Sequence, residues 1–157
     1  MKHILVIGYG NAHRTDDAAG YRAALDYRDA HPDGPARVLA SELLKPPAVE
    51  AMAQADLVIF LDASNPQGEP GAVAVEKLVP DESANGVFAP PLTPARALAA
   101  CRVVYQRTPP TWRISVRGEN YGFGARLSAP VAAALPEMLA RLDALVTAAL
   151  PPRAPRT

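Results

Sequence analysis

The sequence predicts an α/β fold: a single-domain three-layer sandwich with helices on both faces of a mostly parallel, twisted five-stranded sheet that contains one antiparallel strand. Short apolar runs rich in branched residues, at 3–7 and 56–62, are typical of strands buried on both faces. Segments with helical start and stop signals alternate with such runs, which is typical of a parallel sheet. The length of 157 residues fits one domain, placed at residues 1–150.

The first half of the chain predicts three strands and two helices. In order, these are a strand over 3–7, a helix over 16–30, a strand over 37–40, a helix over 46–53 and a strand over 56–62. We expect Thr15 to cap the first helix, because its hydroxyl can accept from a free backbone N–H group. The side chains expected to face the sheet from this helix are Tyr21, Ala24, Leu25 and the stem of Arg28.

The second half predicts two strands and two helices. These are a strand over 72–78, a helix from Thr93 to about residue 101, a strand over 112–116 and a long helix that begins after Ser128. The turn-rich segment 64–71 is too short for a helical crossover, so the strand over 72–78 is expected to run antiparallel to its neighbour, toward an edge of the sheet. Residues 151–157 are rich in proline and arginine, and we expect a disordered tail there.

Composition excludes several classes of function. Sixteen Lys and Arg residues balance sixteen Asp and Glu residues, so no global field draws the chain to nucleic acid or to anionic lipid. The lone cysteine, Cys101, excludes an internal disulfide framework and any multi-cysteine metal site, and it fits a reducing compartment such as the cytoplasm. The apolar runs are shorter than a membrane span, so neither export nor membrane insertion is expected.

Two carboxylates stand where the predicted sheet would place a ligand. Ligands of open parallel sheets gather beyond the carboxyl ends of the strands. Asp17 lies in the first turn of the helix that follows the first strand, and Asp62 closes the most apolar strand, so we expect both to face one cleft. Their oxygens suit a divalent cation, and a histidine would complete a common mixed site. The alternatives are that Asp16 and Asp17 stabilise a helix dipole and that Asp62 caps the following turn.

The loop after the first strand reads Gly8-Tyr9-Gly10-Asn11. We expect Asn11 to shape this loop through hydrogen bonds to the backbone, and Gly8, Gly10 and Gly20 to allow tight turning and close packing. A dinucleotide-binding fingerprint needs a third glycine where this chain has His13, so the match fails. Phosphate-loop and nucleophile-elbow motifs are absent. No organic cofactor is therefore expected.

The stretch G-Y-G-N-A-H-R-T-D-D-A-A-G at residues 8–20, followed by D-L-V-I-F-L-D-A at residues 56–63, resembles the hydrogenase maturation endopeptidases. Pro70-Gly71 and the stretch G-F-G-A-R-L-S at residues 122–128 extend the resemblance over about residues 3–148. It implies an endopeptidase that removes a C-terminal extension from the large-subunit precursor of nickel-iron hydrogenase after nickel is loaded. The substrate would thus supply the nickel. Two acids and a histidine of the family sense it, and Asp17 and Asp62 match the two acids.

The chain departs from this family at the histidine. The family carries it in the loop before the helix that starts here at Thr93, where this sequence reads Ala-Pro-Pro-Leu over residues 89–92. His13 is the candidate replacement ligand, and the alternative is that it is a solvent-exposed imidazole. The missing histidine also keeps two other functions open: a noncatalytic relative that binds the precursor or its nickel, and a small-ligand-binding doubly wound domain. We expect Asp16→Asn to matter much less than Asp62→Asn.

Overall fold

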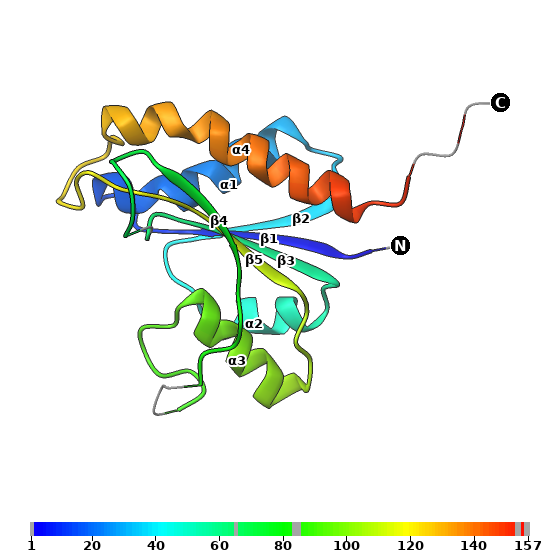
Figure 1. Cartoon of the computed structure of the whole chain (residues 1–157). Helices are drawn as coiled ribbons and strands as arrows, with labels where there is room; N and C mark the ends of the chain where they lie inside the picture. Colours follow the sequence, from blue (N-terminus) through cyan, green and yellow to red (C-terminus); the bar gives the residue numbers. More distant parts are fainter. Residues whose placement is uncertain (1, 65, 83–85, 153–154, 156–157) are drawn as a thin grey trace.

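The chain folds around one five-stranded sheet with helices on both faces, as the sequence predicts (Figure 1). The structure is a computed structural model and describes residues 2–64, 66–82, 86–152 and 155. The elements are β1 (Ile4–Tyr9), the 3-10 helix η1 (Thr15–Ala18), α1 (Ala19–Ala30), β2 (Ala36–Ser41), α2 (Pro46–Ala53), β3 (Leu57–Asp62), β4 (Val73–Lys77), α3 (Pro94–Tyr105), β5 (Thr111–Val116) and α4 (Ala129–Ala149).

The strand order is β2-β1-β3-β5-β4. β1 pairs in parallel with β2 and β3, and β3 pairs in parallel with β5. β4 lies at the edge and pairs antiparallel with β5, which confirms the orientation predicted from the short segment before it. This order puts the carboxyl ends of β1 and β3 side by side, where ligands of open α/β sheets bind.

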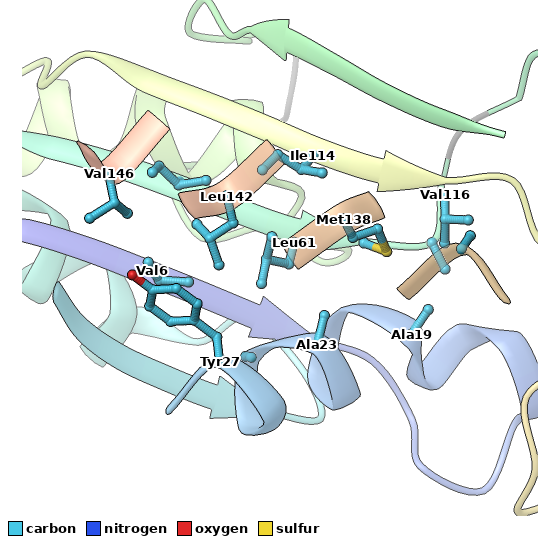
Figure 2. Close-up of a cluster of buried hydrophobic side chains, with 14 of the residues drawn as sticks. Val6, Ala19, Ala23, Tyr27, Leu61, Ile114, Val116, Met138, Leu142 and Val146 are labelled. Carbon is cyan, nitrogen blue, oxygen red and sulfur yellow. The ribbon is translucent and has the colours of Figure 1, made fainter. Parts of the chain in front are cut away.

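Two apolar cores lie on opposite faces of the sheet. α1 and α4 cover one face, and α2 and α3 cover the other (Figure 1). Figure 2 shows the first core, in which Met138 and Leu142 of α4 lie against the sheet near Leu61. Alternate residues of β3 serve the two cores, because successive side chains of a strand point to opposite faces. Ile59 and Leu61 therefore join the first core, and Val58 and Phe60 join the second.

The helix predicted over residues 16–30 is two elements, and Thr15 does not cap it. Thr15 has a φ of 48°, and its hydroxyl donates a 2.7 Å hydrogen bond to the carbonyl of Gly122. The 3-10 helix η1 covers Thr15–Ala18, and the α-helical spacing begins only at Ala19. The capping prediction was wrong because Thr15 holds a distant loop instead.

The buried face of α1 also differs from the prediction. The buried residues are Ala19, Gly20, Ala23, Ala24 and Tyr27. Of the side chains expected to face the sheet, only Ala24 is buried, whereas Tyr21 and Leu25 are half-buried and Arg28 is exposed. Small residues on this face let α1 approach the sheet closely. The prediction relied on the spacing of the larger apolar residues and therefore chose the wrong face of the helix.

Two predicted helix starts differ in their caps. The Thr93 hydroxyl accepts a 3.3 Å hydrogen bond from the N–H of Arg96, as expected of a cap for α3. Ser128 precedes α4, but its hydroxyl donates to Asp16 rather than capping the helix.

The tail expected over residues 151–157 lies mostly outside the described residues. In the described part of the chain, no helix has both the length and the apolarity to cross a bilayer.

Candidate functional site

A cleft of about 190 Å³ lies at the carboxyl ends of β1 and β3. Its lining residues are Tyr9, Asp17, Asp62, Ala63, Ser64 and Tyr121. The two acids singled out in the sequence thus line the same cleft, one from the turn after β1 and the other from the last position of β3. Their roles in catalysis and in contact with nickel stay predictions.

Asp62 is a buried carboxyl group with two hydrogen bonds. Its side chain lies at the end of the fully buried strand β3, and the residue is 2% exposed. Oδ2 accepts from the hydroxyl of Tyr9 at 2.9 Å, and Oδ1 accepts from the N–H of Ser64 at 3.2 Å. Burial raises the pKa of Asp62, while the positive charge of Arg113 and these hydrogen bonds act in the opposite direction. A cation in the cleft would favour the charged form that burial disfavours.

Two tyrosines complete the cleft, and sequence reasoning did not assign either to it. Burial, followed by the negative charge of Asp62, raises the pKa of Tyr9, so this hydroxyl stays protonated and donates to Asp62. Tyr121 donates a 2.6 Å hydrogen bond to the carbonyl of Ala63 and accepts from the N–H of Gly118 at 3.1 Å. Tyr9 could have been found from its position, because it ends β1 directly beside the strand that ends at Asp62.

Asp17 is held by the loop that follows β1. The N–H of Asn11 donates to Oδ2 of Asp17 at 2.8 Å, and Oδ1 of Asn11 accepts from the N–H of His13 at 2.8 Å. Asn11 therefore shapes the loop with its backbone and its side chain together. Asp17 is half-buried, so its carboxylate remains accessible from the cleft.

Glycines bring this loop and α1 close to the ends of the strands. Gly10 has a φ of 150°, and a Cβ there would overlap the carbonyl of Asp17. Gly20 packs α1 onto β3, since a Cβ at this position would overlap the carbonyl of Leu61. Gly8 of β1 packs against α1, since a Cβ at this position would overlap the carbonyl of Gly20. At each of the three positions a Cβ would overlap backbone, so only glycine fits without a shift of the chain.

Asp16 is a structural centre, and the smaller effect expected of Asp16→Asn than of Asp62→Asn on processing stays a prediction. It is fully buried, and Oδ2 accepts from the N–H groups of Glu119 and Asn120 and from the hydroxyl of Ser128, at 2.8 to 2.9 Å. Oδ1 accepts from the N–H of Ser128 at 2.8 Å. Asp16 thus ties η1 to the loop between β5 and α4, and its charge lies at the N-terminus of α4 rather than of its own helix.

The structure does not bring His13 into the cleft. His13 is exposed, and it is not among the residues that line the cleft. The loop before α3 supplies no imidazole either: Pro90, Pro91 and Leu92 line an apolar groove of about 610 Å³ that shares Tyr9 with the cleft. Within the residues that the structure describes, no three His, Cys, Asp or Glu side chains gather as a metal site would require.

No protein-family model and no curated protein matches this sequence. Solved structures do match its fold. The hydrogenase maturating endopeptidase HybD from E. coli is 23% identical, with 93% of each chain covered and a TM-score of 0.73. The [NiFe] hydrogenase maturation protease HycI from Thermococcus kodakarensis KOD1 is 23% identical, with 92% of each chain covered and a TM-score of 0.69. An endopeptidase from Escherichia coli, solved in solution, is 23% identical, with 94% of each chain covered and a TM-score of 0.71. The chain therefore has the fold of the hydrogenase maturation proteases.

Proposed function

We propose that the chain is an endopeptidase that removes a C-terminal extension from the nickel-loaded large-subunit precursor of a nickel-iron hydrogenase, in the cytoplasm. The observation that carries this proposal is the shared cleft, in which Asp17 and Asp62 lie at the carboxyl ends of β1 and β3. The fold of the hydrogenase maturation proteases, over more than nine-tenths of each chain, supports the proposal.

In this proposal nickel is part of the substrate. A site of two carboxylates without nitrogen ligands holds free nickel weakly. Nickel that arrives already held by the precursor needs fewer ligands from this chain, so the oxygens of Asp17 and Asp62 suffice to recognise it. Hydrogen bonds from Asn11, Tyr9 and Ser64 orient the two carboxylates toward the cleft before substrate binds.

The contact with nickel places the C-terminal segment of the precursor against the cleft. Hydrolysis then adds water to the carbonyl carbon of the scissile peptide bond and breaks the bond between carbon and nitrogen. One proton of the water passes to the leaving amine, and the new C-terminus keeps the hydroxyl oxygen. The role given to Asp17 and Asp62 is to position this bond through the nickel.

A second function has one specific observation in its favour. The loop before α3 carries Pro90 and Pro91 where the resembled family has a histidine, and His13 lies outside the cleft. A chain of this fold with only two acids in its cleft could bind the precursor or its nickel without cleaving the extension. Such a maturation factor would need the same two acids.

The test is to incubate the full chain with purified nickel-loaded precursor and to follow the mass of the intact large subunit. A protease shortens the large subunit at one site, and nickel-free precursor stays uncut. Asp62→Asn is the matched control, because the amide keeps the size of the side chain but removes the charge that contacts nickel. If the precursor keeps its full mass while it forms a stable complex with the wild type, the chain is the noncatalytic factor.

A further inference from the structure

An open apolar groove of about 610 Å³ lies beside the cleft, between the loop that precedes α2 and the loop that precedes α3. Leu43 of the first loop is 62% exposed and Phe88 of the second is 39% exposed, although both side chains are large and apolar. Such side chains at a concave surface indicate a binding site, because a ligand that covers them removes apolar area from water. The residues that line the groove are Tyr9, 43–46, Phe88 and 90–93.

The apolar groove is continuous with the cleft through Tyr9. This residue lines both surfaces, and its hydroxyl donates to Asp62. The cleft, at about 190 Å³, is smaller than the roughly 300–1,000 Å³ of typical ligand pockets, whereas the groove lies within that range. The cleft therefore has room for an ion and a reacting bond, and a peptide that continues from it needs the groove.

The stretch that departs from the resembled family builds one wall of the groove. Pro90, Pro91 and Leu92 stand where that family carries its histidine, and all three line the groove. Proline has a fixed φ, so less backbone freedom is lost when a peptide binds against it. At this place the chain lacks a metal ligand but offers a stiff apolar contact surface.

The groove also has positive charge without a lining acid. Among the described residues that line it, Lys45 alone is charged, and Lys45 forms no ion pair with any residue that the structure describes. The N-terminal ends of α2, at Pro46, and of α3, at its cap Thr93, border the groove and add partial positive charge. Charge complementarity therefore favours a ligand that is mostly apolar and carries a carboxylate.

We propose that the apolar groove binds an apolar stretch of the precursor's C-terminal extension, with an acidic side chain of that stretch paired to Lys45. The extension leaves the reacting bond at the cleft, passes the ring of Tyr9 and lies between the two loops. Burial of Leu43 and Phe88 supplies the affinity, and Lys45 selects extensions with an acidic group. This inference deepens the proposed function and rests on it for the identity of the ligand.

Nickel-free precursor tests the groove by itself, because this precursor stays uncut and brings no metal to the cleft. In calorimetric titrations, the wild type should bind precursor with its extension about tenfold more tightly than precursor truncated before the extension. Leu43→Asp should abolish this difference, because it places a charge on the apolar surface. Val79→Asp is the matched control, since Val79 is 76% exposed and lies outside the groove, and this variant should keep the difference.

Variants of Lys45 test the acidic group. Lys45→Glu should weaken binding of the extended precursor about fivefold, because like charges then face each other, and should leave binding of the truncated precursor unchanged. Lys45→Arg keeps the charge and should bind within about twofold of the wild type. Lys45 is exposed, so both variants should fold, which circular dichroism checks. Equal affinities of Lys45→Glu and the wild type would overturn the pairing with an acidic side chain.

Three other results would overturn the proposal. Equal affinities of the wild type for the extended and the truncated precursor would exclude the extension as the ligand. An equal loss with both precursors in Leu43→Asp would assign the groove to the body of the large subunit. A dimer of this chain in analytical ultracentrifugation that Leu43→Asp dissociates would assign the groove to a second copy.

The cleavage assay with nickel-loaded precursor reports separately on the proposed function. Extension-dependent binding that Leu43→Asp abolishes, together with a precursor that stays uncut, would contradict only the protease function. A precursor that is cut, together with equal binding by the wild type and Leu43→Asp, would contradict only the role of the groove.

Discussion

The hydroxyl of Tyr9 at the end of β1 donates a 2.9 Å hydrogen bond to Oδ2 of Asp62 at the end of β3. Tyr9 also lines the apolar groove beside the cleft, so this hydrogen bond joins the two concave surfaces. Burial and the charge of Asp62 raise the pKa of Tyr9, which keeps its hydroxyl a donor at neutral pH. One oxygen of the buried carboxyl group is thereby held in a set direction.

Tyr9→Phe removes this donor and keeps the ring. The variant should lose about 1 kcal/mol of unfolding free energy, because a buried hydrogen bond is lost. Urea unfolding measures the loss. In the Asp62→Asn background the same substitution should cost clearly less, since the carboxyl group that accepts the hydrogen bond is gone. Equal costs in the two backgrounds would show that Tyr9 and Asp62 are not coupled.

Asp16→Asn should destabilise the fold by about 3 kcal/mol, because three donors converge on one oxygen that the amide cannot fully replace. Asp17→Asn is the matched control. Asp17 accepts from one backbone N–H group and is half-buried, so its loss should stay below about 1 kcal/mol. Thermal and urea unfolding of both variants measure the difference, and similar losses would contradict the structural role of Asp16.

The charge of Asp16 also predicts a pH dependence of stability. Burial by itself raises the pKa of Asp16, but the donors from Asn120, Ser128 and Glu119 outweigh it and lower the pKa overall. A carboxyl group whose pKa is lower in the folded state stabilises the fold above its unfolded value of about 3.9, and this stabilisation is lost as the pH falls through the folded pKa. Unfolding free energies measured between pH 7 and pH 2 should therefore fall less steeply below pH 4 in Asp16→Asn than in the wild type. Parallel curves would contradict this assignment.

The sequence predicted the strands and their arrangement correctly, but it did not predict which distant loops bond to one another. The apolar runs ending at Ile7 and Asp62 predicted two buried strands, because branched residues in short runs favour a central parallel sheet. The short segment before β4 predicted the antiparallel edge strand. Both predictions rest on short stretches of sequence, and the structure confirms both.

Long-range contacts account for what sequence reasoning missed. Asp16 and Asp17 are adjacent and chemically identical, and only the distant residues 119–128 make one of them structural. Thr15 has the residue type of a helix cap, yet its hydroxyl bonds to Gly122. The buried face of α1 follows Gly20 and Ala23, because the sheet leaves no room there for larger side chains.

His13→Ala tests whether this histidine is the replacement ligand. Because His13 is exposed and lies outside the lining of the cleft, the variant should bind nickel within about twofold of the wild type. Calorimetric titrations should give the same ratio of the wild-type affinity to the variant affinity at pH 7.5 and at pH 6. A loss of about tenfold at pH 7.5, together with a smaller loss at pH 6, would show that the loop moves and that the imidazole binds the metal.

The most direct test of the account is the location of nickel in crystals of this protein. Crystals soaked in millimolar nickel chloride, with diffraction recorded at the nickel absorption edge, give an anomalous map that marks the ion itself. We predict a peak in the cleft, within coordination distance of the carboxylates of both Asp17 and Asp62, whatever peaks exposed histidines give. A map with no peak between the two acids would contradict the account.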